Sequence, residues 1–121
     1  MLSNGPRVIG TDTVAVGKSA IAYSKSFRLI DLDSFALEYA VACTGTPNIK
    51  IELEQCTDDT NFYIPNTLAP VIDAVIDTIY HGAQLAPITV EYARFKITEV
   101  TGVVDDSVVT LNLVAQKRFT V

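Results

Sequence analysis

The sequence contains no tryptophan, one histidine and two cysteines among its 121 residues. One histidine is too few for the common metal sites, which combine several imidazole or thiolate ligands. The sequence also places no serine or cysteine where His81 could activate it as a nucleophile, so this histidine is interpreted as a surface or loop residue. We therefore expect no catalytic residue, no metal site and no cofactor, and a protein that is not an enzyme.

Long apolar runs and clusters of basic residues are also missing. No run approaches the ~20 apolar residues that span a bilayer, and Met1–Arg7 lacks the basic start and apolar stretch of a signal peptide. Fourteen acidic residues against nine basic ones give a formal charge of -5, which repels phosphate backbones. We expect neither a membrane nor a nucleic acid as a partner, and a protein that functions where it is made or in an assembly built there.

Strand-like alternation is the strongest feature that the chain does have. Apolar side chains recur at every second position over residues 35–43 and again over residues 49–53, with the turn-forming residues 44–48 between them. Alternation on both sides of a short loop predicts a β-hairpin with one buried face, in which Val41 lies opposite Ile51. The side chains expected to point into the core are those of Tyr39, Val41, Cys43, Ile49, Ile51 and Leu53.

The two cysteines lie far apart in this predicted hairpin. Cys43 is beside the turn, Cys56 is at the far end of the returning strand, and the two face opposite sides. About seven residues at ~3.3 Å each separate them, whereas a disulfide needs Cα atoms within ~7 Å. We expect two free thiols in a reducing compartment, with Cys43 in the core and Cys56 partly exposed.

Strand patterns also fill most of the remaining chain. Short β segments are expected over residues 7–30, and two longer strands over residues 90–100 and 107–116 are expected to form a second hairpin. Turn signals roughly every ten residues indicate a β-sandwich or a barrel. Of these, we expect one all-β domain over residues 8–121, an antiparallel β-sandwich of jelly-roll type. The inward residues of the two longer strands are Ala93, Phe95, Ile97, Val109, Leu111, Leu113 and Ala115.

Residues 68–81 fit two different structures. Their apolar side chains recur at helical spacing, with Asp73 and Asp77 on the polar face. The same stretch is rich in valine, isoleucine and threonine, which favour strands. Both alternatives stay open: an extended segment or one short helix around residues 68–80. A connection is expected over residues 82–87.

Residues 1–7 have the composition of a terminal arm. They are mostly small or polar and include Gly5 and Pro6, and such termini are disordered unless a partner holds them. Leu2, Pro6 and Arg7 are therefore candidate contacts to a partner.

The outward side chains of the strand over residues 90–100 form a second candidate contact. Tyr92, Arg94 and Lys96 alternate with the inward residues of this strand. Tyrosine and arginine are enriched at protein interfaces, so these side chains are interpreted either as a recognition patch or as an ordinary solvated strand face.

Two aspartate pairs have an ordinary explanation. Asp31 with Asp33 and Asp58 with Asp59 offer oxygen ligands to calcium, but neither pair has the further ligands of a known calcium loop. Aspartate is common in turns because its carboxylate accepts hydrogen bonds from nearby amides. We interpret both pairs as turn residues.

Three glutamates share the outward face of the first predicted hairpin. Glu38 and Glu54 are expected roughly opposite one another, with Glu52 beside them and Lys50 nearby. Paired carboxylates perform acid–base chemistry only where their environments separate their pKa values. A water-exposed sheet face does not do this, so we interpret these residues as a solvated surface.

The order of these features resembles that of a known family. The first predicted hairpin with its Thr44-Gly45-Thr46-Pro47 turn, the acidic loop at residues 58–62 and the Tyr-x-Arg-Phe strand at residues 92–95 resemble small β-sandwich head decoration (cement) proteins of tailed bacteriophages. The resemblance covers roughly residues 24–116.

The resemblance implies a virion structural protein without enzymatic activity. Such a protein is made in the host cytoplasm, binds the capsid exterior and bridges coat subunits, with the major capsid protein or copies of itself as partners. Trimers and lattice-bound monomers are both implied, and a terminal arm such as residues 1–7 would reach a neighbouring subunit.

A carbohydrate-binding or other ligand-binding β-sandwich module is the alternative. Modules of this kind have a similar size and present exposed aromatic platforms to sugars, whereas this chain has no tryptophan and its tyrosines are dispersed in the sequence. An exposed row of two or three aromatic side chains favours the sugar-binding module. An ordered arm that reaches a neighbouring chain favours the capsid protein.

Overall fold

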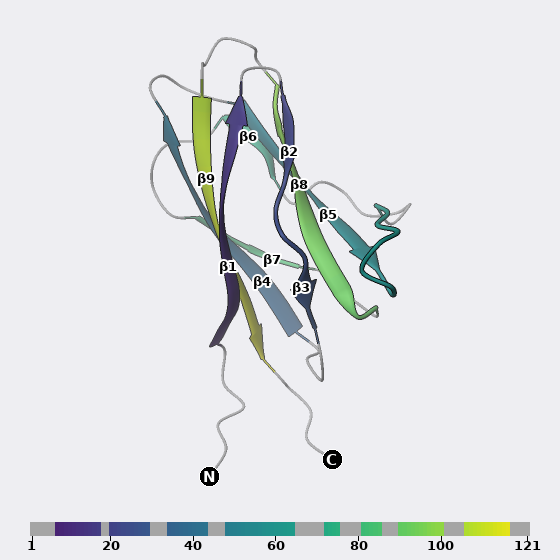
Figure 1. Ribbon diagram of the computed structural model, residues 1–121. Helices are drawn as coiled ribbons and strands as arrows, with labels where there is room; N and C mark the ends of the chain where they lie inside the picture. The colour runs from purple at the N-terminus through teal and green to yellow at the C-terminus, as the bar shows by residue number, and fades with distance from the viewer. Residues whose placement is uncertain are drawn as a thin grey trace.

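The computed structural model describes residues 7–17, 20–29, 34–43, 48–64, 72–75, 81–85, 90–100 and 106–116. These ranges contain nine β-strands and no helix (Figure 1). The strands are β1 (Arg7–Gly17), β2 (Ile21–Tyr23), β3 (Phe27–Arg28), β4 (Ser34–Cys43), β5 (Asn48–Cys56), β6 (Ile72–Val75), β7 (His81–Gln84), β8 (Tyr92–Glu99) and β9 (Asp106–Gln116).

The strands form two antiparallel sheets that pack face to face (Figure 1). One sheet has the order β1-β9-β4-β7 and is called the β9 sheet below. The other has the order β2-β8-β5-β6, with β3 also paired to β8, and is called the β8 sheet. The predicted antiparallel β-sandwich is therefore confirmed.

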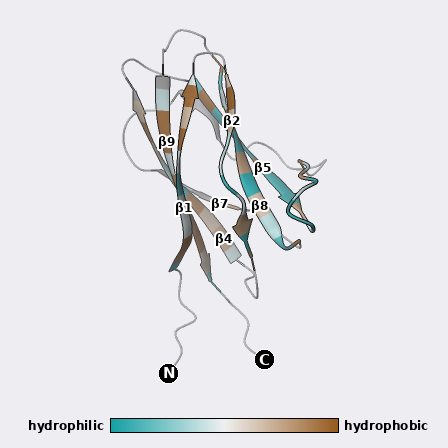
Figure 2. Ribbon diagram, in the orientation of Figure 1, coloured by the Kyte–Doolittle hydropathy of each residue, from teal (hydrophilic) through white to brown (hydrophobic). Residues whose placement is uncertain are grey.

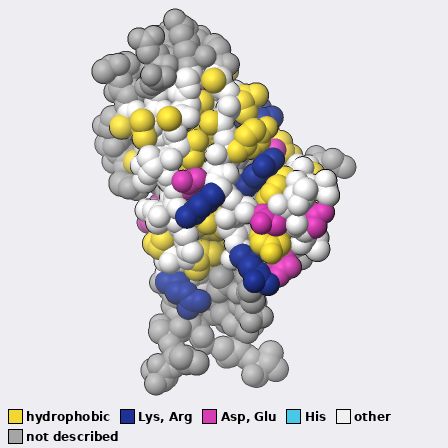
Figure 3. All heavy atoms as spheres, viewed as in Figure 1, with side chains coloured by type: hydrophobic (Ala, Val, Ile, Leu, Met, Phe, Trp, Pro, Cys, Tyr) yellow, Lys and Arg dark blue, Asp and Glu magenta, His cyan; other side chains and the backbone are white. Residues whose placement is uncertain are grey.

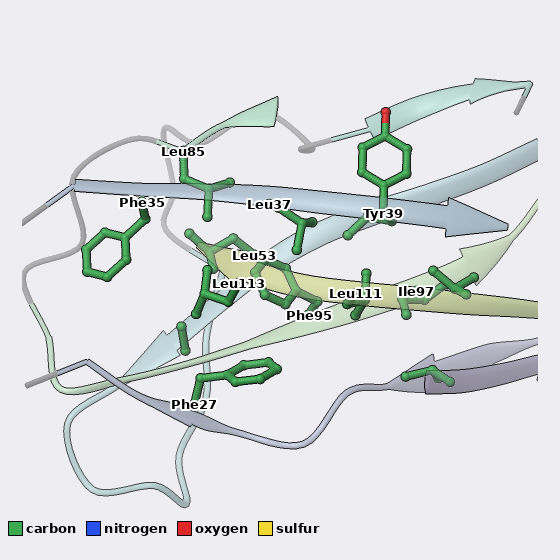
Figure 4. Close-up of a cluster of buried hydrophobic side chains, with 14 of the residues drawn as sticks. Phe27, Phe35, Leu37, Tyr39, Leu53, Leu85, Phe95, Ile97, Leu111 and Leu113 are labelled. Atoms are coloured by element: carbon green, nitrogen blue, oxygen red, sulfur yellow. The ribbon is translucent and has the colours of Figure 1, made fainter. Parts of the chain in front are cut away.

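Alternation along the strands builds the core between these sheets. On β8, buried residues alternate with partly exposed ones along the whole strand, and Leu111 and Leu113 on β9 are fully buried. Figure 4 shows Leu53 and Phe95 of the β8 sheet lying against Leu37 and Leu113 of the β9 sheet. The inward faces predicted for the strands of both sheets are confirmed, because a sandwich strand must bury one face and expose the other.

The two predicted hairpins are wrong, and for the same reason. β4 pairs with β9, so that Leu37 lies opposite Leu113, whereas β5 pairs with β8, so that Leu53 lies opposite Phe95. The consecutive strands β4 and β5 therefore lie in different sheets, and so do β8 and β9. Alternation states which face of a strand is buried; it does not state which strand is its hydrogen-bonding partner.

Residues 68–87 contain two strands where the structure describes them. β6 at Ile72–Val75 pairs with β5, which confirms the strand alternative for these residues. β7 pairs with β4, with His81 opposite Tyr39, so the connection predicted over residues 82–87 is wrong in its first part. The sequence His-Gly-Ala-Gln has little strand propensity, and the β4 edge supplies the hydrogen-bonding partners that make it a strand. Residues 68–71 and 76–80 lie outside the described ranges.

Cys56 is a free thiol, as predicted, but it is buried rather than partly exposed. The chain turns back beside β5 after this residue, and the backbone of Tyr63 exchanges two hydrogen bonds with that of Gln55, at 2.9 and 3.0 Å. Tyr63 therefore forms an antiparallel bridge with Gln55 near the end of β5. The side chain of Cys43 lies outside the described part of the structure.

The first described residue, Arg7, belongs to β1 and pairs with Ala115 of β9. Leu2 and Pro6 lie outside the described residues, and so does the rest of the predicted arm. A shift in register between Val8 and Gly10 follows in β1. Gly10 permits a close approach between the sheets, because a Cβ atom at this position would lie 2.3 Å from Cδ1 of Phe27 on β3.

One carboxyl group lies inside the sandwich. Glu99, at the end of β8, is opposite Ile49 on the inward face and is only 1% exposed. Its Oε2 accepts a hydrogen bond from the backbone N–H of Asn48, at 3.4 Å. The buried face of β8 therefore ends in a glutamate, Glu99, after a series of apolar residues.

Candidate functional site

The outward side chains of β8 occupy the middle of the outer face of the β8 sheet. Tyr92, Arg94, Lys96 and Thr98 are partly exposed, as their alternation with buried neighbours predicts. Strands β2 and β3 flank β8 on one side and β5 flanks it on the other. In Figure 2 the hydrophilic colour is strong on β8, on β5 and on the segment that follows β5.

Strand register brings residues that are distant in the sequence beside this row. Lys96 lies between Tyr23 of β2 and Glu52 of β5, and Arg94 lies opposite Glu54 of β5. Directly paired residues in antiparallel strands point to the same face. Side chains from β2, β5 and β8, which are tens of residues apart in the sequence, therefore meet on the outer face of the β8 sheet.

Arg94 lies between two aromatic rings at the centre of this face. Its Cζ is 4.4 Å from the ring centroid of Tyr23 and 4.3 Å from that of Phe62, within the range of cation–π contacts. Its Nε donates a hydrogen bond to Oε1 of Glu54, at 2.7 Å. A short charge-assisted bond and two ring contacts hold one guanidinium in place. We call Tyr23, Glu54, Phe62 and Arg94 the arginine stack.

A tight turn after β5 positions Phe62. Oδ1 of Asp58 accepts hydrogen bonds from the backbone N–H groups of Thr60, at 3.0 Å, and Asn61, at 2.9 Å. Oδ2 accepts another from the side-chain amide of Asn61, at 2.6 Å. These hydrogen bonds, with those from Asn61 the largest cause, lower the pKa of Asp58 to about 2 because they favour the ionised carboxylate. The expected turn role of Asp58 is confirmed, and Asp59 beside it has a φ of 59°. Asp31 and Asp33 lie outside the described residues.

The predicted group of three glutamates is separated by the fold. Glu54 is buried and paired with Arg94, so it is not a solvated residue. Glu38 is exposed on β4, in the other sheet, and therefore does not lie opposite Glu54. Glu52 stays on the outer face of the β8 sheet, 4.0 Å from Nζ of Lys50.

Charged, aromatic and apolar side chains lie side by side on this surface. Figure 3 shows Lys and Arg next to Asp and Glu, with apolar side chains between them, over β8 and the segment after β5. At one edge, Arg28 donates to Glu91 at 3.0 Å, and this hydrogen bond raises the pKa of Arg28. Tyr23 and Tyr63 each expose almost half of their surface. The surface can therefore offer ring faces and edges together with hydrogen-bond donors.

The described ranges contain no cluster of three or more His, Cys, Asp or Glu residues that could hold a metal ion. They also contain no helix that is both long and apolar enough to cross a bilayer. The side chain of His81 lies outside the described residues.

The arrangement of Tyr92, Arg94 and Lys96 on one face is the part of the site that alternation predicts. Tyr23 and Phe62 escaped prediction, although both rings contact Arg94. Tyr23 belongs to a strand of three residues, and Phe62 follows a turn. The aspartate at the start of that turn was visible in the sequence, but no local signal states that the chain returns beside β5 and brings Phe62 against Arg94.

No protein-family model matches this sequence, and no curated protein does. Solved structures of a family 29 carbohydrate-binding module have a similar fold. A lysine-to-alanine mutant of that module superposes with a TM-score of 0.51 at 14% identity, covering 97% of this chain and 98% of the other. An aspartate-to-alanine mutant also has a TM-score of 0.51 at 14% identity, covering 93% of this chain and 85% of the other. A second lysine-to-alanine mutant, complexed with cellulohexaose, has a TM-score of 0.50 at 13% identity, covering 93% of this chain and 91% of the other. At these identities the likeness shows the β-sandwich fold alone.

Proposed function

We propose that this protein is a non-catalytic β-sandwich module that binds a carbohydrate on the outer face of the β8 sheet. The observation that carries the proposal is the arginine stack, in which Arg94 is held between the rings of Tyr23 and Phe62. Its fold is similar to that of a carbohydrate-binding module solved with a bound glucan oligosaccharide, which supports the same proposal.

The chemistry of the stack suits a sugar. A pyranose ring has apolar C–H faces and a rim of hydroxyl groups, so it is bound by aromatic rings combined with fixed hydrogen-bonding groups. Nε of Arg94 is used by Glu54, and its two Nη groups make no hydrogen bond to the described residues. These donors lie beside Tyr23, which is 46% exposed. The guanidinium is already oriented, so little side-chain entropy is lost when a ligand accepts its remaining hydrogen bonds.

A binding role also fits the state of the carboxylates on this face. Glu54 is engaged by Arg94 and Glu52 lies close to Lys50. An acid–base pair would instead need two carboxylates in contrasting environments beside an open site. The proposed module therefore holds its ligand without transforming it.

The test is binding to a panel of soluble neutral and acidic polysaccharides, measured by affinity electrophoresis and isothermal titration calorimetry. Arg94→Ala should weaken binding of the preferred glycan at least about tenfold, which corresponds to about 1.4 kcal/mol. Arg28→Ala is the matched control, because Arg28 is an exposed, ion-paired arginine at the edge of the same sheet. It should change the affinity less than about twofold.

Tyr23→Ala provides a second variant, since truncating a half-exposed side chain disturbs the fold less than removing the partner of Glu54 does. It should also weaken binding, with the melting temperature nearly unchanged. Failure of the protein to bind any glycan in the panel would contradict the proposal. Unchanged affinity in both Arg94→Ala and Tyr23→Ala would remove the binding site from this face.

The resemblance to phage head decoration proteins stays a prediction, together with the capsid partner, the self-association and the virion location that it implies. The mass of the native particle, measured by light scattering on untagged material, tests it. A particle of megadaltons containing many copies of the chain would support the decoration role.

A further inference from the structure

We infer that the carbohydrate is acidic: a polymer of uronic acid residues whose carboxylates pair with Lys96. This inference rests on the proposed function and specifies the ligand class of the same surface. It comes from the way in which the basic side chains of the β8 sheet are paired.

Three of the basic side chains on or beside this face have an acidic partner. Arg94 pairs with Glu54 at 2.7 Å, Arg28 with Glu91 at 3.0 Å, and Lys50 with Glu52 at 4.0 Å. Lys96 has no ion pair with the described residues, although it occupies the central strand of the surface. Lys96 is therefore an unpaired cation at the middle of the face, whereas Lys25, which also has no ion pair with the described residues, lies at the rim between β2 and β3, 5.8 Å from the ring centroid of Phe27.

The neighbours of Lys96 leave its charge available. Tyr23 lies beside it on β2 and Glu52 beside it on β5, and the carboxylate of Glu52 is near Lys50. Lys96 is partly exposed, so its aliphatic stem can lie on the sheet while the ammonium group reaches water. A ligand that contacts Tyr23 therefore meets a cation next to the ring.

Arg94 supplies a second cationic group at a fixed distance. It is two residues from Lys96 on the same strand and the same face, about 7 Å away along the strand. The ring of Tyr23 contacts the Arg94 guanidinium, and Tyr23 is the strand partner of Lys96. One exposed ring beside an unpaired ammonium group and the unused Nη donors of Arg94 matches a uronic acid, whose carboxylate projects from the edge of the pyranose ring while the ring face stacks.

The net charge of the protein makes this local arrangement informative. A formal charge of -5 disfavours polyanions at long range, so an acidic polymer gains affinity only through short-range contacts. Lysine is a compact point charge that suits a single carboxylate, and arginine adds directed hydrogen bonds. Lys96 is thus the residue that selects charge, and the arginine stack orients the sugar.

The experiment compares polygalacturonate with the same polymer after methyl esterification, which removes the carboxylate charge and keeps the sugar backbone. The wild-type protein should bind polygalacturonate at least about tenfold more tightly than the esterified form. Lys96→Gln should abolish this preference, and Lys96→Arg should retain most of it. Arg28→Gln is the matched control, because Arg28 lies at the edge of the same sheet and is already paired with Glu91; it should keep the preference.

The outcomes separate this inference from the proposed function. Equal or tighter binding of the esterified polymer, or a preference that survives Lys96→Gln, would overturn the acidic ligand and leave the glycan-binding module intact. Binding of neutral polysaccharides alone would have the same meaning. Absence of binding to every glycan tested, charged or neutral, would overturn both.

Discussion

The outer faces of the two sheets differ sharply, although their inner faces follow the same rule. The outer face of the β9 sheet consists largely of small, uncharged side chains: Val108 lies between Ala15 and Ala42, and Thr110 lies between Thr13 and Ala40. The outer face of the β8 sheet carries the arginine stack and the pairs of charged residues around it. One sandwich therefore presents one surface of mostly small side chains, with Glu38 as an exposed carboxylate, and one surface rich in hydrogen-bonding groups.

The difference has a structural cause beyond composition. The segment after β5 turns back and brings the ring of Phe62 against Arg94. Glu54 and Cys56 on β5 are only 7% and 1% exposed, even though their neighbours in β8 mark this as the outer side. The candidate site thus lies where the returning segment, paired beside β5, meets the outer face of the β8 sheet.

The largest effect on stability is expected from a change at the contact between the two sheets, where Gly10 of β1 lies against Phe27 of β3. Gly10→Ala would place a Cβ atom 2.3 Å from Cδ1 of Phe27, whose ring is buried and lies 6.2 Å from that of Phe95. Overpacking of this kind lowers the free energy of unfolding by about 1–3 kcal/mol, measured by urea denaturation. Gly82→Ala is the control, because its nearest atom would be the carbonyl oxygen of Leu37 at an ordinary 3.9 Å. Equal stability of the two variants would contradict this prediction, because it would show that the ring of Phe27 can move to accommodate the added Cβ atom.

A smaller effect is expected from removing a carboxylate charge on each face. Glu54→Gln removes the charge of a nearly buried side chain and so weakens its charge-assisted hydrogen bond with Arg94. It should lower the free energy of unfolding by about 1 kcal/mol. Glu38→Gln changes an exposed residue on the β9 sheet and should stay within about 0.5 kcal/mol of the parent. Similar losses in both variants would mean that the two faces are energetically alike.

The turn that carries Phe62 should respond to acid. The folded-state pKa of Asp58, about 2, lies below the ordinary value of about 3.9. The carboxylate therefore stabilises the turn fully above about pH 4, and this contribution disappears as the pH falls through about 2. The backbone amide resonances of Thr60 and Asn61 should shift with an apparent pKa near 2.

Two variants calibrate that titration. Asp58→Asn should abolish it, because the amide that replaces the carboxylate does not ionise in this range. Asp59→Asn should leave it intact, because asparagine tolerates the positive φ of that position. Titration near pH 4 in the parent would show that the three hydrogen bonds to Asp58 do not hold in solution.

The smallest effect on stability and binding is expected from a substitution on the outer face of the β9 sheet. Thr110→Lys places a charge between Thr13 and Ala40 on the outside of the β9 sheet. Because an outward lysine keeps its ammonium in water, stability should change by no more than about 0.5 kcal/mol. Glycan affinity should also be unchanged, and a clear loss would place the binding surface on the β9 sheet instead.

Local patterns explain which parts of the site could be anticipated. Arg94 and Lys96 are on the face that period-two alternation assigns to them, and Asp58 occupies the turn that its residue type favours. Tyr23 could not be anticipated, since its strand has three residues and no alternation to count. The contact of Phe62 with Arg94 depends on a reversal of the chain after β5, which no local pattern signals.

The sequence by itself determined the fold class and the inward face of each long strand, because alternation is a local property of the chain and burial of one face is its direct consequence. Only the tertiary structure decided which strands pair, because β4 and β5 each offer the same backbone groups to any neighbour. In the fold, β4 pairs with β9 and β5 pairs with β8. It also decided the candidate site: Tyr23, Phe62 and Arg94 are separated by 39 and 32 residues in the chain (62 − 23 and 94 − 62) and meet only when β2, β8 and the returning segment are assembled. Contacts between residues so distant in sequence depend on packing, which no local pattern specifies.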